Sequence, residues 1–102
     1  MKTIYISGVM TGKEGFNFNE FNKWAFIWRG RGYEVINPAE HPIQEYRDML
    51  VYDLKLIREK CTDIFFLEGW QEDGAVGSFA EYGLAKWLGL EMHFEVCERG
   101  RK

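Results

Sequence analysis

The sequence has 102 residues and a formal net charge of −3, from 13 Lys and Arg against 16 Asp and Glu, with a pI of about 5.4. This length indicates a single domain and excludes a TIM barrel, a kinase and a two-domain dehydrogenase. The mild acidic balance argues against nucleic acid as a partner, because nucleic-acid modules usually carry a basic face. Hydrophobic residues make up 46% of the chain, enough for a buried core.

The chain has no segment that predicts export or a membrane. No apolar run approaches the roughly 20 residues of a membrane span, and the apolar start is too short for a signal peptide. Cys61 and Cys97 form no metal-binding pattern, and neither His41 nor His93 has partners at metal-ligand spacing. We therefore expect reduced thiols, a cytoplasmic protein and no metal site.

Apolar runs and helical stripes alternate along the chain. A β-branched and aromatic run at residues 4–6 predicts a buried strand, and a glycine-bearing loop at 8–15 follows it. An apolar stripe at i, i+3, i+4 and i+7 then predicts a helix that Asn17 or Asn19 caps. That helix ends at Gly30 or Gly32, and the later elements are a strand at 33–36, a helix at 44–60, a strand at 64–67, a loop at 69–77, a helix at 78–88 and an edge strand at 90–96.

Strands that alternate with helices predict an α/β fold, a three-layer sandwich around a four-stranded parallel sheet. Ligands of such sheets bind beyond the carboxyl ends of the strands. We therefore expect the loops at 8–15, 37–41 and 68–77 to converge at one edge.

Glu81 lies near the start of the predicted helix at 78–88. Ser78, three residues earlier, fits a capping box in which Glu81 has only a structural role. In the alternative interpretation the helix dipole keeps this carboxylate ionised at the ligand edge, where it is a usable nucleophile. The small neighbours Gly77 and Gly83 would let a ligand or another helix come close.

Asp53 falls on the apolar stripe of the predicted helix at 44–60, among Leu50, Leu54 and Ile57. An unpaired carboxylate on a buried face is costly, so a structural ion pair is one interpretation. A partly desolvated Asp53 would instead have a raised pKa and act as a proton donor. Asp48 lies off the stripe, and we expect it to face solvent.

The loops carry further candidates. The loop at 8–15 resembles a phosphate loop, but its spacing is one residue short and Glu14 stands where Ser or Thr must bind magnesium. Nucleoside triphosphate hydrolysis is therefore not predicted. Trp70 is either a stacking platform for a base or a loop-packing residue. Phe16 and Phe18 are expected to be core or loop anchors.

Five motifs in this order resemble the nucleoside 2-deoxyribosyltransferase family, and in particular its small phage- and bacteria-associated members. The resemblance covers residues 2–96. The motifs are Ile4-Tyr5-Ile6-Ser7-Gly8-Val9-Met10-Thr11-Gly12, Asn37-Pro38-Ala39-Glu40, Asp53-Leu54, Asp63-Ile64-Phe65-Phe66-Leu67-Glu68-Gly69-Trp70, and Gly77-x-x-x-Glu81-x-Gly83-x-Ala85.

The resemblance implies that Glu81 is the nucleophile, that Asp53 helps to protonate the leaving base and that Tyr5 orients Glu81. The implied substrate-binding residues are Gly8, Val9, Met10 and Gly77 around the sugar, with Gly69 and Trp70 as candidate contacts for the base. We expect a flavodoxin-like or Rossmann-like sheet of order 2-1-3-4, one domain at 1–97 and a tail at 98–102.

The implied reaction is cleavage of the N-glycosidic bond of a 2′-deoxynucleoside or deoxynucleotide, with deoxyribosyl transfer to another base or to water and no cofactor. Val9 and Thr11 stand where relatives that hydrolyse 5′-monophosphates carry Ser and Arg, which leaves the phosphate preference open. One alternative is a non-catalytic nucleotide-binding or sequestering protein, and another is a structural protein. The family and the 17% aromatic content favour a homodimer or higher homo-oligomer.

Overall fold

The computed structural model describes residues 1–10, 12–41, 45–72 and 75–96, so Thr11, Cys97 and the predicted tail lie outside the described residues. Four strands form one parallel sheet in the order β2-β1-β3-β4, which confirms the predicted α/β class and strand order. The elements are β1 (Thr3–Ser7), η1 (Glu14–Asn17), α1 (Phe18–Gly30), β2 (Glu34–Ile36), η2 (Pro38–Glu40), α2 (Tyr46–Lys60), β3 (Asp63–Phe66), α3 (Val76–Leu88) and β4 (Glu91–Phe94).

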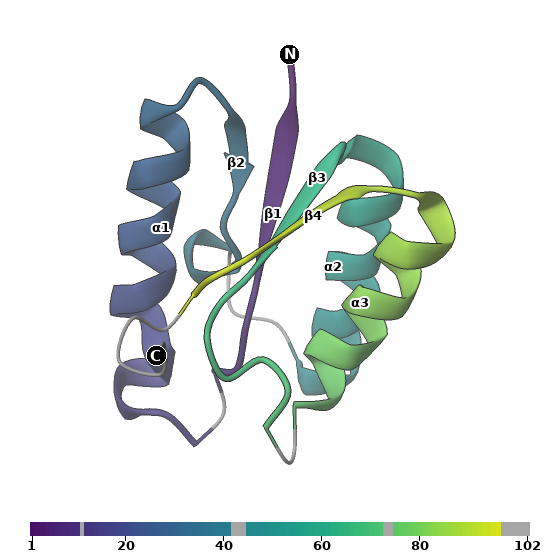
Figure 1. Cartoon of the computed structure of the whole chain (residues 1–102). Coiled ribbons are helices and arrows are strands. Elements are labelled where there is room, and N and C mark those ends of the chain that lie inside the picture. The colour runs from purple at the N-terminus through teal and green to yellow at the C-terminus, as the bar shows by residue number, and fades with distance from the viewer. Residues whose placement is uncertain (11, 42–44, 73–74, 97–102) are drawn as a thin grey trace.

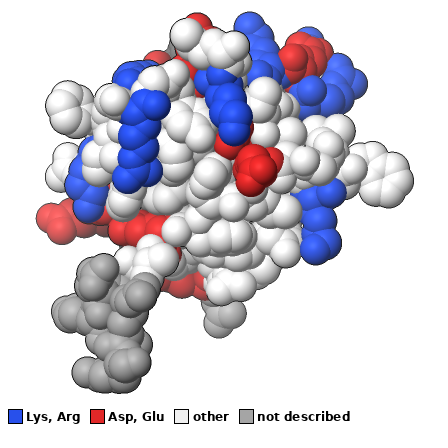
Figure 2. All heavy atoms as spheres, turned by 45° about the horizontal axis from the view of Figure 1, so that its top comes forward, with Lys and Arg blue, Asp and Glu red and all other residues white. Residues whose placement is uncertain are grey.

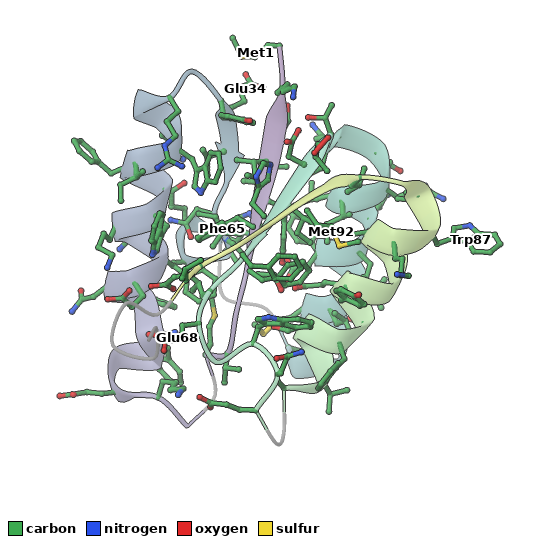
Figure 3. All side chains as sticks on the ribbon, in the orientation of Figure 1. Met1, Glu34, Phe65, Glu68, Trp87 and Met92 are labelled. Carbon is green, nitrogen blue, oxygen red and sulfur yellow. The ribbon has the colours of Figure 1, made fainter. Side chains whose placement is uncertain are left out.

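The helices cover both faces of the sheet. Figure 1 shows α1 on one face and α2 with α3 on the other. Side chains alternate along a strand, so β1 sends Ile4 and Ile6 into the cluster around α1 and Tyr5 into the cluster around α2 and α3. Phe65 of β3 packs on the α1 side and Met92 of β4 on the other side (Figure 3). The central strands are consequently apolar on both faces.

A buried carboxyl lies at the amino-terminal end of β3, opposite the predicted ligand edge. Asp63 is fully buried, and its Oδ2 lies 2.9 Å from Nε2 of His93. Thr62 Oγ1 contacts the other carboxyl oxygen, and the His93 ring packs against Trp28. These contacts satisfy the carboxyl and tie β3 to the edge strand β4.

No helix in the described parts of the chain is both long and apolar enough to cross a membrane. The view of Figure 2 turns the amino-terminal ends of the strands toward the reader, and acidic side chains lie among the basic ones on this face.

Replacing His93 with Ala is expected to lower the free energy of unfolding by about 2 kcal/mol, because the buried carboxyl of Asp63 loses a hydrogen-bonding partner. Urea denaturation monitored by circular dichroism measures the change. Glu91→Ala, on the same edge strand but exposed, is the matched control. An equal loss in the two variants would contradict this role of the His93–Asp63 contact.

Candidate active site

A cavity of about 460 Å³ opens at the carboxyl-terminal edge of the sheet. Figure 1 shows this edge of the sheet at the bottom. Its walls come from the end of β1 and the loop after it, from the η2 segment, from α2 and from the start of α3. The three loops predicted to converge therefore do so, since each contributes lining residues. The cavity brings together most of the predicted site residues: Tyr5, Gly8, Val9, Met10, Asp53, Gly77 and Glu81.

Glu81 is held by the two polar side chains on one face of β1. The Tyr5 hydroxyl donates to Oε2 at 2.8 Å, and the Ser7 hydroxyl donates to Oε1 at 2.6 Å. All three side chains are buried, with at most 5% of each residue exposed. Sequence reasoning missed Ser7, although the period of two along a buried strand places it on the same face as Tyr5.

The predicted capping box is wrong. Helix α3 begins at Val76 rather than Ser78, its N-cap is Ala75, and its first turn holds no acidic residue. Ser78 is therefore inside the helix, where its Oγ lies 3.2 Å from Oγ of Ser7. Glu81 lies beyond the first turn, where the dipole effect has largely decayed.

Burial reverses the expected ionisation of Glu81. Loss of solvation raises the pKa of this carboxyl to about 8; the hydrogen bonds from Ser7 and Tyr5 lower it, and the nearby charge of Asp53 raises it. Glu81 therefore holds a proton at neutral pH, where the sequence interpretation expected an ionised carboxylate. Burial and Glu81 also raise the pKa of Tyr5 well above its ordinary value, so Tyr5 remains a donor.

Asp53 reaches the same cavity from α2, and burial raises its pKa as expected of a partly desolvated carboxyl. Tyr5 and His41 partly oppose this rise. His41 Nδ1 lies 3.6 Å from Oδ1 of Asp53, and the His41 ring meets Tyr52 edge-on. Asp48 is exposed, as predicted. The sequence interpretation considered His41 only as a metal ligand, although its loop was expected at this edge.

The loop after β1 is held close to the sheet. A side chain at Gly8 would place its Cβ 2.7 Å from Cδ1 of Leu67, the residue after β3, so only glycine fits without a shift of the Leu67 side chain. Asn17 occupies the N-cap position of α1 but makes no side-chain cap; its amide donates to the carbonyl of Val9 at 3.1 Å. Asn17 therefore fixes the cavity wall instead of the helix end.

The aromatic loop residues are arranged differently from expectation. Trp70 stacks on Tyr82, with ring centroids 5.1 Å apart, and packs near Phe66. Neither Gly69 nor Trp70 lines the cavity, which favours the loop-packing interpretation of Trp70 and leaves their contact with a base a prediction. Phe16 is 61% exposed and is not a core anchor, whereas Phe18 lines the cavity mouth.

Among the described residues, no three His, Cys, Asp or Glu side chains gather as metal ligands. What the cavity presents instead is one buried carboxyl and one partly buried carboxyl, with hydroxyl and imidazole partners.

The fold is that of a flavodoxin-like α/β protein. A solved structure of a 2-desoxiribosyltransferase from Leishmania mexicana matches it with a TM-score of 0.72 at 20% sequence identity. The match covers 92% of this chain and 63% of that one, so the chain spans less than two thirds of the length of that enzyme. Residues 2–94 match the family described as a domain of unknown function (DUF4406), and the chain belongs to this family. A search of curated proteins gave no match.

Replacing Glu81 with Gln is expected to stabilise the protein increasingly as pH rises. The folded protein holds the Glu81 proton up to about pH 8, whereas the unfolded chain releases it near the ordinary value of 4.5. The wild type therefore loses stability through this window, by at most about 5 kcal/mol, and the variant does not. Thermal unfolding of both proteins at pH 5 and pH 8 measures the difference, and a gap that does not widen with pH would contradict the burial effect.

Proposed function

We propose that this protein cleaves the N-glycosidic bond of a 2′-deoxynucleoside or deoxynucleotide, with Glu81 as the nucleophile and with deoxyribosyl transfer to another base or to water. One observation carries the proposal. Two carboxyls, Glu81 and Asp53, meet with Tyr5 in a single cavity at the ligand edge of a fold shared with a 2-desoxiribosyltransferase. Retaining glycoside cleavage needs such a pair, because one carboxylate attacks while the other group transfers a proton.

In the proposed first step, an oxygen of Glu81 attacks C1′ of the sugar while the bond from C1′ to the base nitrogen breaks. Asp53 gives its proton to the departing base, and the sugar remains as an ester on Glu81. A second base or a water molecule then attacks C1′ and gives up a proton to the carboxylate of Asp53, while the ester bond breaks and releases the carboxylate of Glu81. Two inversions at C1′ give net retention.

The reactive form has Glu81 ionised and Asp53 protonated. Tyr5 donates to Glu81 at 2.8 Å, and its raised pKa keeps it protonated and able to orient that carboxylate. The less buried Asp53 is the proton donor in this arrangement. His41 Nδ1 lies 3.6 Å from Oδ1 of Asp53, on the far side of this carboxyl from the reaction.

The residues that line the cavity favour a nucleoside over its 5′-monophosphate. Backbone at Gly8, Val9, Met10 and Gly77 would surround the sugar, and α2 supplies an apolar wall through Met49, Leu50 and Val51. The described lining residues include neither Lys nor Arg. A 5′-phosphate would meet two acidic groups and none of these cations, so we expect deoxynucleosides to react faster than their monophosphates.

A nucleotide-binding protein without turnover is the second candidate. The observation that favours it is the pKa of Glu81, which leaves most molecules with a protonated, non-nucleophilic carboxyl at neutral pH. The same cavity would then bind a nucleoside or nucleotide without forming an ester.

We further infer that two or more copies of the chain associate. Trp87 is 86% exposed and points away from the body of the protein on the outer side of α3 (Figure 3), and Phe26 is 80% exposed on α1. Aromatic side chains such as these are enriched at protein interfaces, and contact with a second copy would remove either one from water. We also propose a cytoplasmic location, because the thiol of Cys61 is free, as is usual for cysteines in a reducing compartment.

The activity is tested by incubating the protein with a panel of 2′-deoxynucleosides and their monophosphates, with and without a second free base. Chromatography follows base release and exchange, and intact-mass measurement detects a deoxyribosyl adduct. We expect release by the wild type and loss of at least about a thousandfold in Glu81→Ala. Glu59→Ala, an exposed carboxyl on α2, is the control.

If the wild type and Glu81→Ala both release no base while a nucleotide still binds, the catalytic proposal fails and the binding candidate stands. If nothing binds, both candidates fail.

For an activated deoxynucleoside, whose base leaves without a proton from Asp53, release is expected to rise with pH, since deprotonation of Glu81 creates the nucleophile. The acid limb of kcat/KM should have an apparent pKa near 8, the value that burial gives this carboxyl. Initial rates between pH 5.5 and 9 measure the profile. A rate that is constant from pH 6 to pH 8 would show that Glu81 does not ionise in this range.

Asp53→Asn is expected to slow the release of poor leaving bases by about a hundredfold and that of an activated base by much less, because only the poor leaving group needs a proton. Parallel assays with one natural and one activated deoxynucleoside measure the ratio. Asp48→Asn, an exposed carboxyl on the same helix, is the matched control. Equal slowing of both substrates would argue against an acid role for Asp53.

A further inference from the structure

Ser7 contacts Glu81 from the side that a substrate cannot reach. The Ser7 residue is 1% exposed at the end of β1, and it is not among the residues that line the cavity. Its hydroxyl is nevertheless 2.6 Å from Oε1 of Glu81, within the short range typical of an O–H donor and a carboxylate. Any role of Ser7 is therefore exerted through Glu81.

The two oxygens of Glu81 have different partners. Tyr5, which lines the cavity, donates to Oε2, while Ser7 holds Oε1 from behind. The single proton of Tyr5 is used at Oε2, so Tyr5 cannot replace Ser7 at Oε1.

Ser78 lets the Ser7 hydroxyl serve both protonation states of Glu81. Its Oγ lies 3.2 Å from Oγ of Ser7, one turn before Glu81 on the same helix. When Glu81 is ionised, Ser7 can donate to Oε1 and accept from Ser78. When Glu81 carries a proton on Oε1, the Ser7 hydroxyl can turn to accept it and donate to Ser78 instead, so no buried group loses its partner.

We propose that Ser7 is a positioning residue for the reaction: its hydroxyl, backed by Ser78, fixes Oε1 of Glu81 and donates a hydrogen bond to it whenever Glu81 carries a charge. This inference rests on the proposed function. Ser7 stabilises the carboxylate before attack on C1′ and again as the ester breaks, and it makes no contact with the sugar. Without Ser7, one oxygen of a buried carboxylate lacks a donor, which disfavours the ionised form.

Three other titratable groups lie near Glu81, and none of them is a cation in direct contact with it. Tyr5 comes from β1 and Asp53 from α2, and His41 lies behind Asp53. The Asp53 charge raises the pKa of Glu81, so the hydroxyls of Ser7 and Tyr5 are the groups that oppose its protonation. Removing one of these two donors should therefore be directly visible in the titration of Glu81.

The test compares wild type with Ser7→Ala, Ser7→Thr and Ser78→Ala. Carbon-13 NMR of labelled Glu carboxyls gives the pKa of Glu81 directly, with Glu81→Gln to assign the signal. In Ser7→Ala the pKa should rise by about one unit, and kcat/KM at pH 7 should fall about tenfold with its acid limb displaced by the same amount. Ser7→Thr keeps the hydroxyl and should restore both, while Ser78→Ala should give a smaller rise.

Thermal unfolding separates this role from a structural one, since a packing defect lowers the unfolding temperature without moving the titration. An unchanged Glu81 pKa in Ser7→Ala, or a Ser7→Thr variant as impaired as Ser7→Ala, overturns the proposal, and Ser78→Ala repeats the measurement should Ser7→Ala fail to fold. If the wild type releases no base while Ser7→Ala still raises the pKa, the proposed function fails but the control of Glu81 by Ser7 stands.

Discussion

The candidate active site depends on the burial of one carboxyl between a strand and a helix. Glu81 of α3 lies against β1, where the side chains of Tyr5 and Ser7 give each of its oxygens a hydroxyl partner. This arrangement is possible because the side chains of β1 point alternately to the two faces of the sheet. Its other face, Ile4 and Ile6, packs under α1, which leaves the polar positions to meet α3. A one-residue slip of β1 would turn Ile6 toward the carboxyl and bury it without donors.

The chain buries a second carboxyl, that of Asp63, at the opposite edge of the sheet, and its surroundings differ from those of Glu81. Asp63 is as well buried as Glu81, but its partners are the imidazole of His93 and the hydroxyl of Thr62. The recorded partners of Glu81 are neutral hydroxyls, and its charged neighbour is another acid. The Asp63 site satisfies its carboxyl permanently, whereas the Glu81 site leaves its carboxyl easy to protonate, which is characteristic of functional sites.

Much of the fold could be predicted from the sequence because the apolar residues mark both the buried strands and the helical stripes clearly. The apolar runs of β1 and β3 and the stripe of α1 place these elements within one or two residues of their observed bounds. The start of α3 was misjudged because Ser78 and Glu81 match a capping box, while the true N-cap, Ala75, carries no side-chain signal. That shift of two residues changed the predicted electrostatics of Glu81 from a helix end to a buried interior. The convergence of the three loops followed from topology, whereas the grouping of Tyr5, Asp53 and Glu81 was implied by the family resemblance. The period of two puts Ser7 on the face of Tyr5, but its contact with Glu81 required coordinates, as did the contact of His41 with Asp53, because partners on different elements leave no periodic pattern.

The contacts of Glu81 also join distant parts of the chain, since Tyr5 and Ser7 lie 76 and 74 residues before it. Contacts at such separation close a long loop, and the entropy of closing it must be met before the contacts stabilise the fold. A chain emerging from the ribosome has Tyr5 and Ser7 long before it has α3, so Glu81 first appears in water as an ordinary, ionised carboxyl. Its unusual proton affinity arises only when α3 docks on β1, so the protonation of this one side chain reports that the two ends of the chain have come together.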